Sequence, residues 1–189
     1  SSYLGYEPGA NGAAIVSGSG STWTSSADLS VGRGGDGRLD IANGGAVSNS
    51  IGYVGYESGS TGAVTVRGAG SAWTNSATLL VGLNGNGSLA ITGGGSVSNA
   101  GSYIGWSGDS SSVAVSGPGS SWTSAGDLYI AWFGDAEMDI TNGAAVSNAG
   151  GYIGYYSGSR THVQVRGAGS RWTNSGDLDI GNGLFGSDK

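Results

Sequence analysis

The feature that most constrains the fold is an internal repeat that runs through the whole chain. Four related segments, YLGYE, YVGYE, YIGWS and YIGYY, begin at residues 3, 53, 103 and 152, at spacings of 50, 50 and 49 residues. Tryptophan recurs with the same period in the frame G-x-G-S-x-W-T, at Trp23, Trp73, Trp122 and Trp172. A fixed period of this length is typical of solenoids, propellers and other repeat arrays.

Each long unit divides into two related halves. The segment AVTVRGAGSAWTNSATLLVGLNGNG is followed by SLAITGGGSVSNAGSYIGWSGDSS, and the V-x-V of the first half matches the L-x-I of the second. The underlying period is therefore about 25 residues. We expect one solenoid domain over residues 1–189, with double repeats at 3–52, 53–102 and 103–151 and a partial one at 152–189.

Short alternating apolar runs, and no helical period, fill each repeat. Glycine is abundant, at 41 of 189 residues, and it interrupts these runs every few positions, which is typical of short strands joined by tight turns. We predict an all-β fold, a right-handed parallel β-helix with about 25 residues per coil and seven coils after a partial first one. A propeller is the weaker alternative, because its blades need four strands and seldom divide into two related halves.

In a solenoid, equivalent residues of successive coils form columns. Three columns are apolar throughout and are predicted to face the core: Val16, Ile41, Val66, Ile91, Val115, Ile140 and Val165; Ala14, Leu39, Val64, Leu89, Val113, Met138 and Val163; and Leu4, Val31, Val54, Val81, Ile104, Ile130, Ile153 and Ile180. A fourth column alternates large and small side chains, which fills a core without voids: Trp23, Val47, Trp73, Val97, Trp122, Val146 and Trp172.

Two polar columns follow the tryptophan column. The first holds only Ser and Thr, from Thr24 to Thr173, and the second, from Ser25 to Asn174, is Asn in every coil except those of Ser25 and Ser124. We expect the Asn column to hydrogen-bond along the stack. We expect the Ser/Thr column to accept the buried indole N–H groups. An ice-binding face is a weaker interpretation, because the chain has no T-x-T array.

The repeat GAGSAWTNSATLLVGLNGNGSLAITGGGSVSNAGSYIG, at residues 68–105, resembles the repeats of bacterial autotransporter passenger domains. The likeness covers essentially the whole chain. It implies a right-handed β-helix displayed on the surface of a Gram-negative bacterium or released from it, with a role in adhesion, autoaggregation or biofilm formation. It also implies a longer parent protein with a signal peptide and a membrane β-barrel, so that contact with a membrane belongs to the barrel and not to this chain.

Charge and composition exclude several classes of partner. The net charge is −6 and the isoelectric point is about 4.4, which argues against binding to nucleic acid. The chain contains no cysteine and therefore no disulfide, thiol nucleophile or cysteine metal site. We expect no cofactor.

Candidate catalytic groups are few, so we do not expect an enzyme. The only histidine, His162, aligns with Ala13, Ala63 and Ser112, which indicates variation at the start of a coil. The carboxylates that lie closest together in the sequence are Asp135, Glu137 and Asp139, and Asp177 and Asp179. Asp177 belongs to a repeated position, which favours a structural role, whereas general acid–base catalysis needs groups gathered at one place.

We expect no metal site. The segment GGDG at residues 34–37 is similar to a calcium-binding nonapeptide, but its aspartate stands in a different place and the motif does not recur. Carboxylates at the ligand spacing of a calcium loop are otherwise missing from the sequence.

Aromatic residues gather in a single part of each coil. One column reads Tyr3, Ser30, Tyr53, Leu80, Tyr103, Tyr129, Tyr152 and Asp179, and a second, just after a recurring glycine, reads Tyr6, Arg33, Tyr56, Leu83, Trp106, Trp132, Tyr155 and Asn182. Alternation predicts that the first column faces outward, and Arg33 and Asn182 suggest that the second lies at a corner. We call Tyr3, Tyr53, Tyr103, Tyr129, Tyr152, Trp106, Trp132 and Tyr155 the aromatic stripe.

The aromatic stripe has two interpretations. It is either cross-coil stacking that stabilises the rod or a contact surface. The function that we expect is a structural and adhesive segment of a secreted surface protein, which binds itself, a host protein or a glycan through this side face, or associates end to end through uncapped terminal coils. The alternative is a protein that binds or cleaves polysaccharide.

Overall fold

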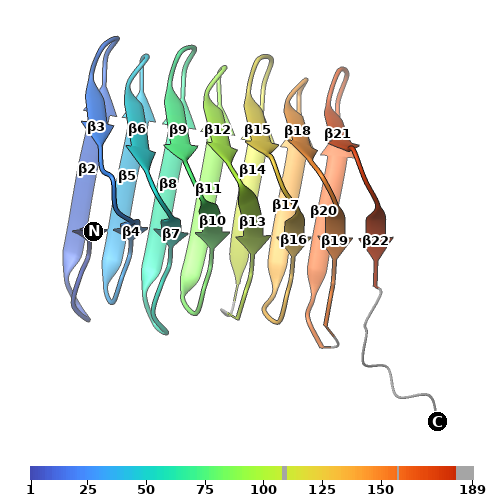
Figure 1. Ribbon diagram of the computed structural model, residues 1–189, viewed down its shortest axis with the longest axis horizontal. Coiled ribbons are helices and arrows are strands. Elements are labelled where there is room, and N and C mark those ends of the chain that lie inside the picture. The colour runs from blue at the N-terminus through green and yellow to red at the C-terminus, as the bar shows by residue number, and fades with distance from the viewer. Residues whose placement is uncertain (108–109, 157, 182–189) are drawn as a thin grey trace.

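The chain folds into a rod of stacked coils (Figure 1). The structure, a computed structural model, describes residues 1–107, 110–156 and 158–181, and every regular element within them is a β-strand. Those residues contain no helix long and apolar enough to cross a membrane. All strand pairs are parallel and join equivalent positions of successive coils. The predicted all-β solenoid is therefore confirmed.

Three sheets run along the rod. Sheet A contains β1 (Ser2–Leu4), β4 (Leu29–Val31), β7 (Gly52–Val54), β10 (Thr78–Val81), β13 (Gly101–Ile104), β16 (Leu128–Ile130), β19 (Gly151–Ile153) and β22 (Leu178–Ile180). Sheet B contains β2 (Asn11–Ser17), β5 (Asp36–Ala42), β8 (Thr61–Arg67), β11 (Asn86–Thr92), β14 (Ser111–Ser116), β17 (Ala136–Thr141) and β20 (Thr161–Arg166). Sheet C contains β3 (Thr22–Thr24), β6 (Ala46–Asn49), β9 (Ala72–Asn75), β12 (Ser96–Asn99), β15 (Ser121–Ser124), β18 (Ala145–Asn148) and β21 (Arg171–Asn174).

One coil consists of a strand from each sheet in the order B, C, A. Coil 1 is β2–β4 and coil 7 is β20–β22, and β1 belongs to a partial coil before them. In Figure 1 the strands of sheet A run downward on the near side while those of sheet B rise on the far side, as the chain advances from left to right. This winding is right-handed, as predicted.

The core consists of the predicted apolar columns. The register pairs Val16, Ile41 and Val66 in sheet B, and Val31, Val54 and Val81 in sheet A. The members in the middle of the rod are almost completely buried. In coil 7 no described coil covers the column ends, and there Ile180 is 70 % exposed and Val165 44 %.

The tryptophan column also faces the core, but its hydrogen-bond partner differs from the prediction. The indole N–H groups of Trp73 and Trp122 donate to Oδ1 of Asn49 and Asn99, both at 2.7 Å, and not to the Ser/Thr column. The reason is strand alternation: the Ser/Thr column follows an inward residue and points outward, whereas the Asn column turns inward again. The amide of Asn49 in turn donates to Asn75 at 2.8 Å, so the predicted stacking of Asn along the rod is confirmed.

A left-handed residue forms the corner after each strand of sheet A. Gly55 has φ +74°, and a Cβ there would lie 2.4 Å from the carbonyl oxygen of Asn86 at the start of β11. Glycine therefore recurs at this position, where other residues would be strained. The exception is Ala131, which has φ +59° and is buried.

Candidate functional site: the aromatic side of the rod

The first column of the aromatic stripe lies on the outer surface of sheet A. The strand register joins Tyr3 to Ser30 and Tyr53, and then continues through Leu80, Tyr103, Tyr129, Tyr152 and Asp179. Each tyrosine lies between two inward residues, as Tyr53 does between Gly52 and Val54. The predicted outward direction of this column is therefore confirmed.

The glycine corner brings the second column to the same side. Because the left-handed residue reverses the alternation, the side chain after it points outward. Tyr6 meets Tyr3 edge to face at 4.9 Å between ring centroids, and Trp106 meets Tyr103 in the same way at 4.7 Å. The corner inferred from Arg33 is thus confirmed, while Asn182 lies outside the described residues.

In coils 4–6 the rings form a continuous cluster. Tyr103, Tyr129 and Tyr152 stack face to face at centroid separations of 4.9 and 4.6 Å. Beside them Trp106, Trp132 and Tyr155 stack at 5.5 and 4.3 Å. We call the rings of these coils the eight-ring cluster: Tyr103, Trp106, Tyr129, Trp132, Phe133, Tyr152, Tyr155 and Tyr156.

Two members of this cluster were missed by the sequence analysis. Phe133 and Tyr156 stack at 4.1 Å, and Phe133 is 55 % exposed. They form a third column, one residue after the second, in which the earlier coils carry Glu7, Gly34, Glu57, Asn84 and Ser107. Reading the repeat one position further would have found them.

The first coils are different, because non-aromatic residues separate the rings. Ser30 lies between Tyr3 and Tyr53, and Arg33 lies between Tyr6 and Tyr56. The Arg33 guanidinium carbon lies 4.3 Å from the Tyr6 ring centroid, and one of its nitrogens lies 3.6 Å from a Glu57 oxygen.

A small hollow of about 120 Å³ remains between the tyrosines that Ser30 separates. We call it the tyrosine gap; its lining is Ser1, Tyr3, Asp28, Ser30, Arg33, Tyr53 and Tyr56. The hollow is closed at its floor, because Ser30 is only 4 % exposed. It combines aromatic walls with one cation and one carboxylate, which is a mixture suited to a small polar ligand.

A column of carboxylates borders the stripe. Asp28 and Asp127 accept backbone N–H bonds from the following coil, at 3.2 Å from Ile51 and 2.8 Å from Gly150. These bonds support the structural role predicted for the repeated Asp position. The Tyr129 hydroxyl donates to Oδ2 of Asp127 at 3.3 Å.

The same carboxylates affect the ionisation of the tyrosines. Partial burial, followed by the negative charge of Asp127, raises the pKa of Tyr129 to about 12. Burial and then Asp127 raise the pKa of Tyr103, whereas for Tyr152 the charge of Asp127 comes first and burial second. The stacked hydroxyls therefore remain protonated and able to donate hydrogen bonds at neutral pH.

The carboxylates considered for catalysis do not form one group. Asp135 accepts the backbone N–H of Arg160 at 2.8 Å, and Asp179 lies beside Tyr152 on sheet A. Glu137 and Asp139 lie on the outer surface of sheet B, where His162 joins them from the next coil. That His162 approaches the two carboxylates was not expected from the sequence.

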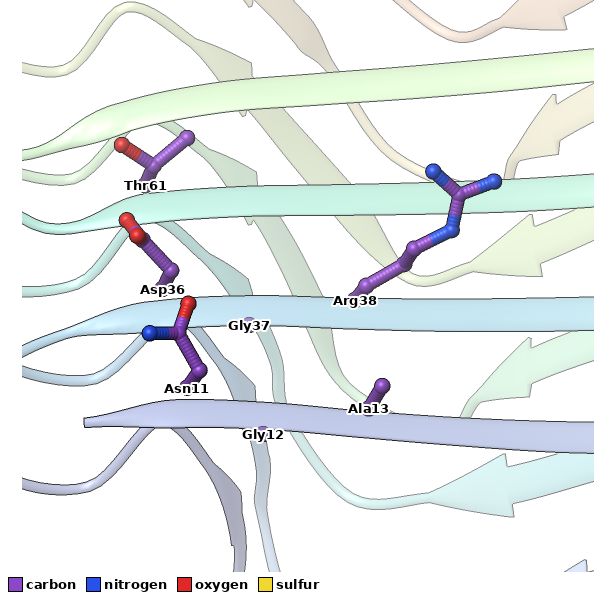
Figure 2. A pocket seen from close by; sticks show the side chains of 7 residues that line it. All are labelled: Asn11, Gly12, Ala13, Asp36, Gly37, Arg38 and Thr61. Atoms are coloured by element: carbon purple, nitrogen blue, oxygen red, sulfur yellow. The ribbon is translucent and has the colours of Figure 1, made fainter.

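A larger hollow of about 300 Å³ lies on the first strands of sheet B (Figure 2). Asn11, Asp36 and Thr61 form a column along one side of it, and Gly12 and Gly37 leave its middle without side chains. Figure 2 shows that the side chains of Asp36 and Arg38 diverge. The glycine-rich segment considered for calcium thus places its aspartate beside Asn11 and Thr61, and the hollow does not direct its charged groups at one point.

In comparisons with known proteins, no family model, curated protein or solved structure matches the chain. The functional assignment therefore depends on the surface itself. The eight-ring cluster is the strongest candidate, because a cluster of exposed and half-buried aromatic rings is typical of recognition surfaces.

Proposed function

We propose that this protein is a structural and adhesive segment of a secreted bacterial surface protein, and that the eight-ring cluster is its contact surface. The observation that carries the proposal is the uninterrupted stacking of rings across coils 4–6 on one side of a rod. The resemblance to passenger repeats supports display on the surface of a Gram-negative bacterium or release from it.

The stacking geometry determines what the surface can bind. Because Tyr103, Tyr129 and Tyr152 lie nearly parallel, at 9° and 11° between planes, each ring face covers the next and the outer surface consists of ring edges and hydroxyls. Such an array is flat, amphipathic and already ordered, so little side-chain entropy is lost on binding. It suits a protein surface, including the same surface of a second copy, better than a sugar that needs a free ring face.

Charge opposes pairing of two copies only weakly. The net charge is −6, and at physiological salt the repulsion between exposed charges is screened over about 8 Å. Tyrosine hydroxyls at the edge of each surface supply both donors and acceptors, which two copies need in order to pair without leaving buried polar groups unsatisfied.

The test replaces Tyr103, Tyr129 and Tyr152 together by Ser, with the double variant Tyr3→Ser/Tyr53→Ser as the matched control. Beads coated with the unmodified protein should aggregate, and its sedimentation coefficient should rise with concentration. The triple variant should lose both effects and the control should keep them. Circular dichroism and the melting temperature establish that each variant is folded.

A triple variant that is folded and aggregates beads as well as the unmodified protein would contradict the proposal. If the triple variant does not fold, replacement of the same three residues by Phe retains the rings and removes the hydroxyls. That variant should weaken self-association without unfolding the rod, since a Phe ring stacks as a Tyr ring does.

Glycan binding is the second candidate function, and the tyrosine gap favours it. There the rings of Tyr3 and Tyr53 are not stacked on each other, and Arg33, Asp28 and Ser30 offer polar groups to sugar hydroxyls. A panel of polysaccharides would test it: binding that is lost in Tyr53→Ser and retained in the triple variant would place the function in the gap. Turnover of any of them would support the enzymatic alternative.

A further inference from the structure

Three side chains with metal-binding chemistry meet on the outer surface of sheet B. Glu137 and Asp139 project from β17, and His162 projects from β20 directly opposite Glu137 in the strand register. One potential ligand atom from each residue lies within 4.8 Å of the other two. Two carboxylates and an imidazole are a donor set that suits a divalent transition metal.

The outer surface of sheet B carries a second aspartate, Asp40, with which Asp139 can be compared. In coil 2, Asp40 occupies the equivalent position and forms two hydrogen bonds with Arg67 of the next coil, at 3.0 and 2.8 Å. Asp139 has an arginine, Arg166, at the matching position. Among the described residues, however, no ion pair joins Asp139 to Arg166.

Asp139 is instead left with an unsatisfied oxygen. Its Oδ1 atom is buried and has no hydrogen-bond partner in the described part of the chain. A buried carboxylate oxygen without a partner is costly, because it has lost water and gained nothing in exchange. A cation bound between Asp139, Glu137 and His162 would remove that cost.

The surroundings leave room for a hydrated ion. Glu137 and His162 also line a hollow of about 230 Å³ together with Asp135, Arg160 and Thr161. Both are exposed, so water can complete the coordination of an ion that three protein ligands hold.

The orientation of the imidazole is also compatible with a ligand role. The amide nitrogen of Gln164 lies 3.1 Å from Nε2 of His162. Rotation of the Gln164 amide by 180° exchanges its oxygen and nitrogen, and the oxygen then accepts a hydrogen bond from the N–H at Nε2 of His162. Nδ1 of the imidazole is then available to bind the ion. A second contact of this kind is the usual companion of a metal-binding histidine.

The cluster does not belong to the repeat. In the column of Glu137 and His162, the other coils carry Ala13, Arg38, Ala63, Ser88 and Ser112. A structural feature of the solenoid would recur from coil to coil, whereas this group of ligands occurs where coil 6 meets coil 7.

We propose that Glu137, Asp139 and His162 form a binding site for one divalent transition-metal ion such as Zn²⁺, which links coils 6 and 7. The site lies on sheet B and is independent of the proposed contact surface on sheet A. Its ligands come from two successive coils, so the bound ion joins neighbouring rungs of the rod.

The experiment titrates the untagged chain with ZnCl₂ after treatment with a chelator. Isothermal calorimetry should give one ion per chain, and Zn²⁺ should raise the melting temperature, since a ligand that binds only the folded state stabilises it. His162 is the only histidine, so its imidazole signals in a proton–nitrogen NMR spectrum report binding without ambiguity and should shift with the added zinc.

Matched variants locate the site. Asp139→Asn and His162→Gln should each weaken zinc binding by about tenfold or more, while Asp40→Asn, at the equivalent position of coil 2, should leave it unchanged. Circular dichroism verifies that each variant is folded, and the surface position of all three residues favours this.

Three outcomes would overturn the proposal. The first is no heat, melting shift or NMR change up to millimolar Zn²⁺. The second is binding that persists unchanged in both Asp139→Asn and His162→Gln. The third is equal displacement of Zn²⁺ by Ca²⁺, which would indicate a carboxylate site without the histidine.

Discussion

The aromatic side of the rod has two parts that the same repeat builds in different ways. From the partial first coil to coil 3, tyrosines occur in every second coil, and Ser30 and Leu80 separate them. In coils 4–6 each coil carries aromatic residues, and the rings stack on one another. The strand spacing is the same in both parts. Whether the tyrosine rings touch is therefore decided by the residue that the coil between them carries in the same column.

This difference separates two roles that a row of tyrosines can have. Where a ring is stacked on both sides, as Tyr129 is between Tyr103 and Tyr152, its faces stabilise the rod and only its edge meets solvent. Where Ser30 separates Tyr3 from Tyr53, the two tyrosines line a hollow instead of stacking. The first arrangement provides a smooth contact surface and the second a small cleft.

The largest expected effect concerns the corner that brings both columns to one side. Replacing Gly55 by Ala puts a Cβ 2.4 Å from a backbone oxygen at a left-handed φ, so we expect a loss of about 3 kcal/mol or more in the free energy of unfolding. Ala131→Gly, at the same corner of the stacked part, should stay within about 1 kcal/mol of the unmodified protein. Urea unfolding measures both, and a loss below about 1 kcal/mol for Gly55→Ala contradicts the assigned corner geometry.

The next prediction compares single rings in the two parts. Tyr129→Ser removes two stacked and two edge-to-face ring contacts, whereas Tyr53→Ser removes one edge-to-face contact with Tyr56. Because three more aromatic pairs are lost, at about 0.5–1.5 kcal/mol each, Tyr129→Ser should cost about 1.5 kcal/mol or more beyond the cost of Tyr53→Ser. Chemical denaturation of both variants measures the difference, and equal losses would show that stacking along the column adds nothing to stability.

A third prediction is that one substitution in the first coils produces the stacked arrangement of coils 4–6. Tyr129 fits between two tyrosines that are two coils apart, and Ser30 occupies the same position between Tyr3 and Tyr53. Ser30→Tyr should therefore fill the tyrosine gap and raise the free energy of unfolding by about 1 kcal/mol. Ser30→Leu, which copies Leu80, is the control. Destabilisation by the tyrosine but not by the leucine would show that the gap does not accept a ring.

The smallest effect is on pH dependence. The folded state holds the proton of Tyr129 more tightly, with a pKa of about 12 against 10.0 for an unperturbed tyrosine. A raised pKa contributes stability that is complete below pH 10 and is lost as the pH rises towards 12. The fall in unfolding free energy over this range should be shallower in Tyr129→Phe, as measured by denaturation at several pH values; identical slopes would argue against the assigned shift.

Most of the architecture was predictable because a solenoid turns sequence period directly into spatial neighbours. The inward columns of Val and Ile and the outward column of Tyr3 and Tyr53 follow from the 25-residue repeat and strand alternation alone. The indole partner was wrongly predicted because it depends on which of two polar columns turns inward after Trp73.

The sequence was less informative where the repeat is broken. Phe133 and Tyr156 are the only aromatic residues of their column, so the column as a whole did not stand out as aromatic in the sequence. The meeting of Asp139 with His162 was missed because the two residues stand 23 positions apart in the sequence, far from the short spacing by which ligands are usually recognised. In a β-helix, a separation close to one coil is the spacing that brings two side chains together.

Three tryptophans of the core column, Trp73, Trp122 and Trp172, each donate to an asparagine of the preceding coil. This pairing has a consequence for how such a protein changes its length. Trp73 and Trp122 lie in odd-numbered coils and bond to Asn49 and Asn99 in even-numbered coils. A gene duplication or deletion that adds or removes two coils keeps every indole beside its amide, whereas one that shifts by a single coil places tryptophan on tryptophan and overfills the interior. Recombination can therefore lengthen or shorten the rod in steps of about 50 residues, which makes the pair of coils, and not the single coil, the heritable unit.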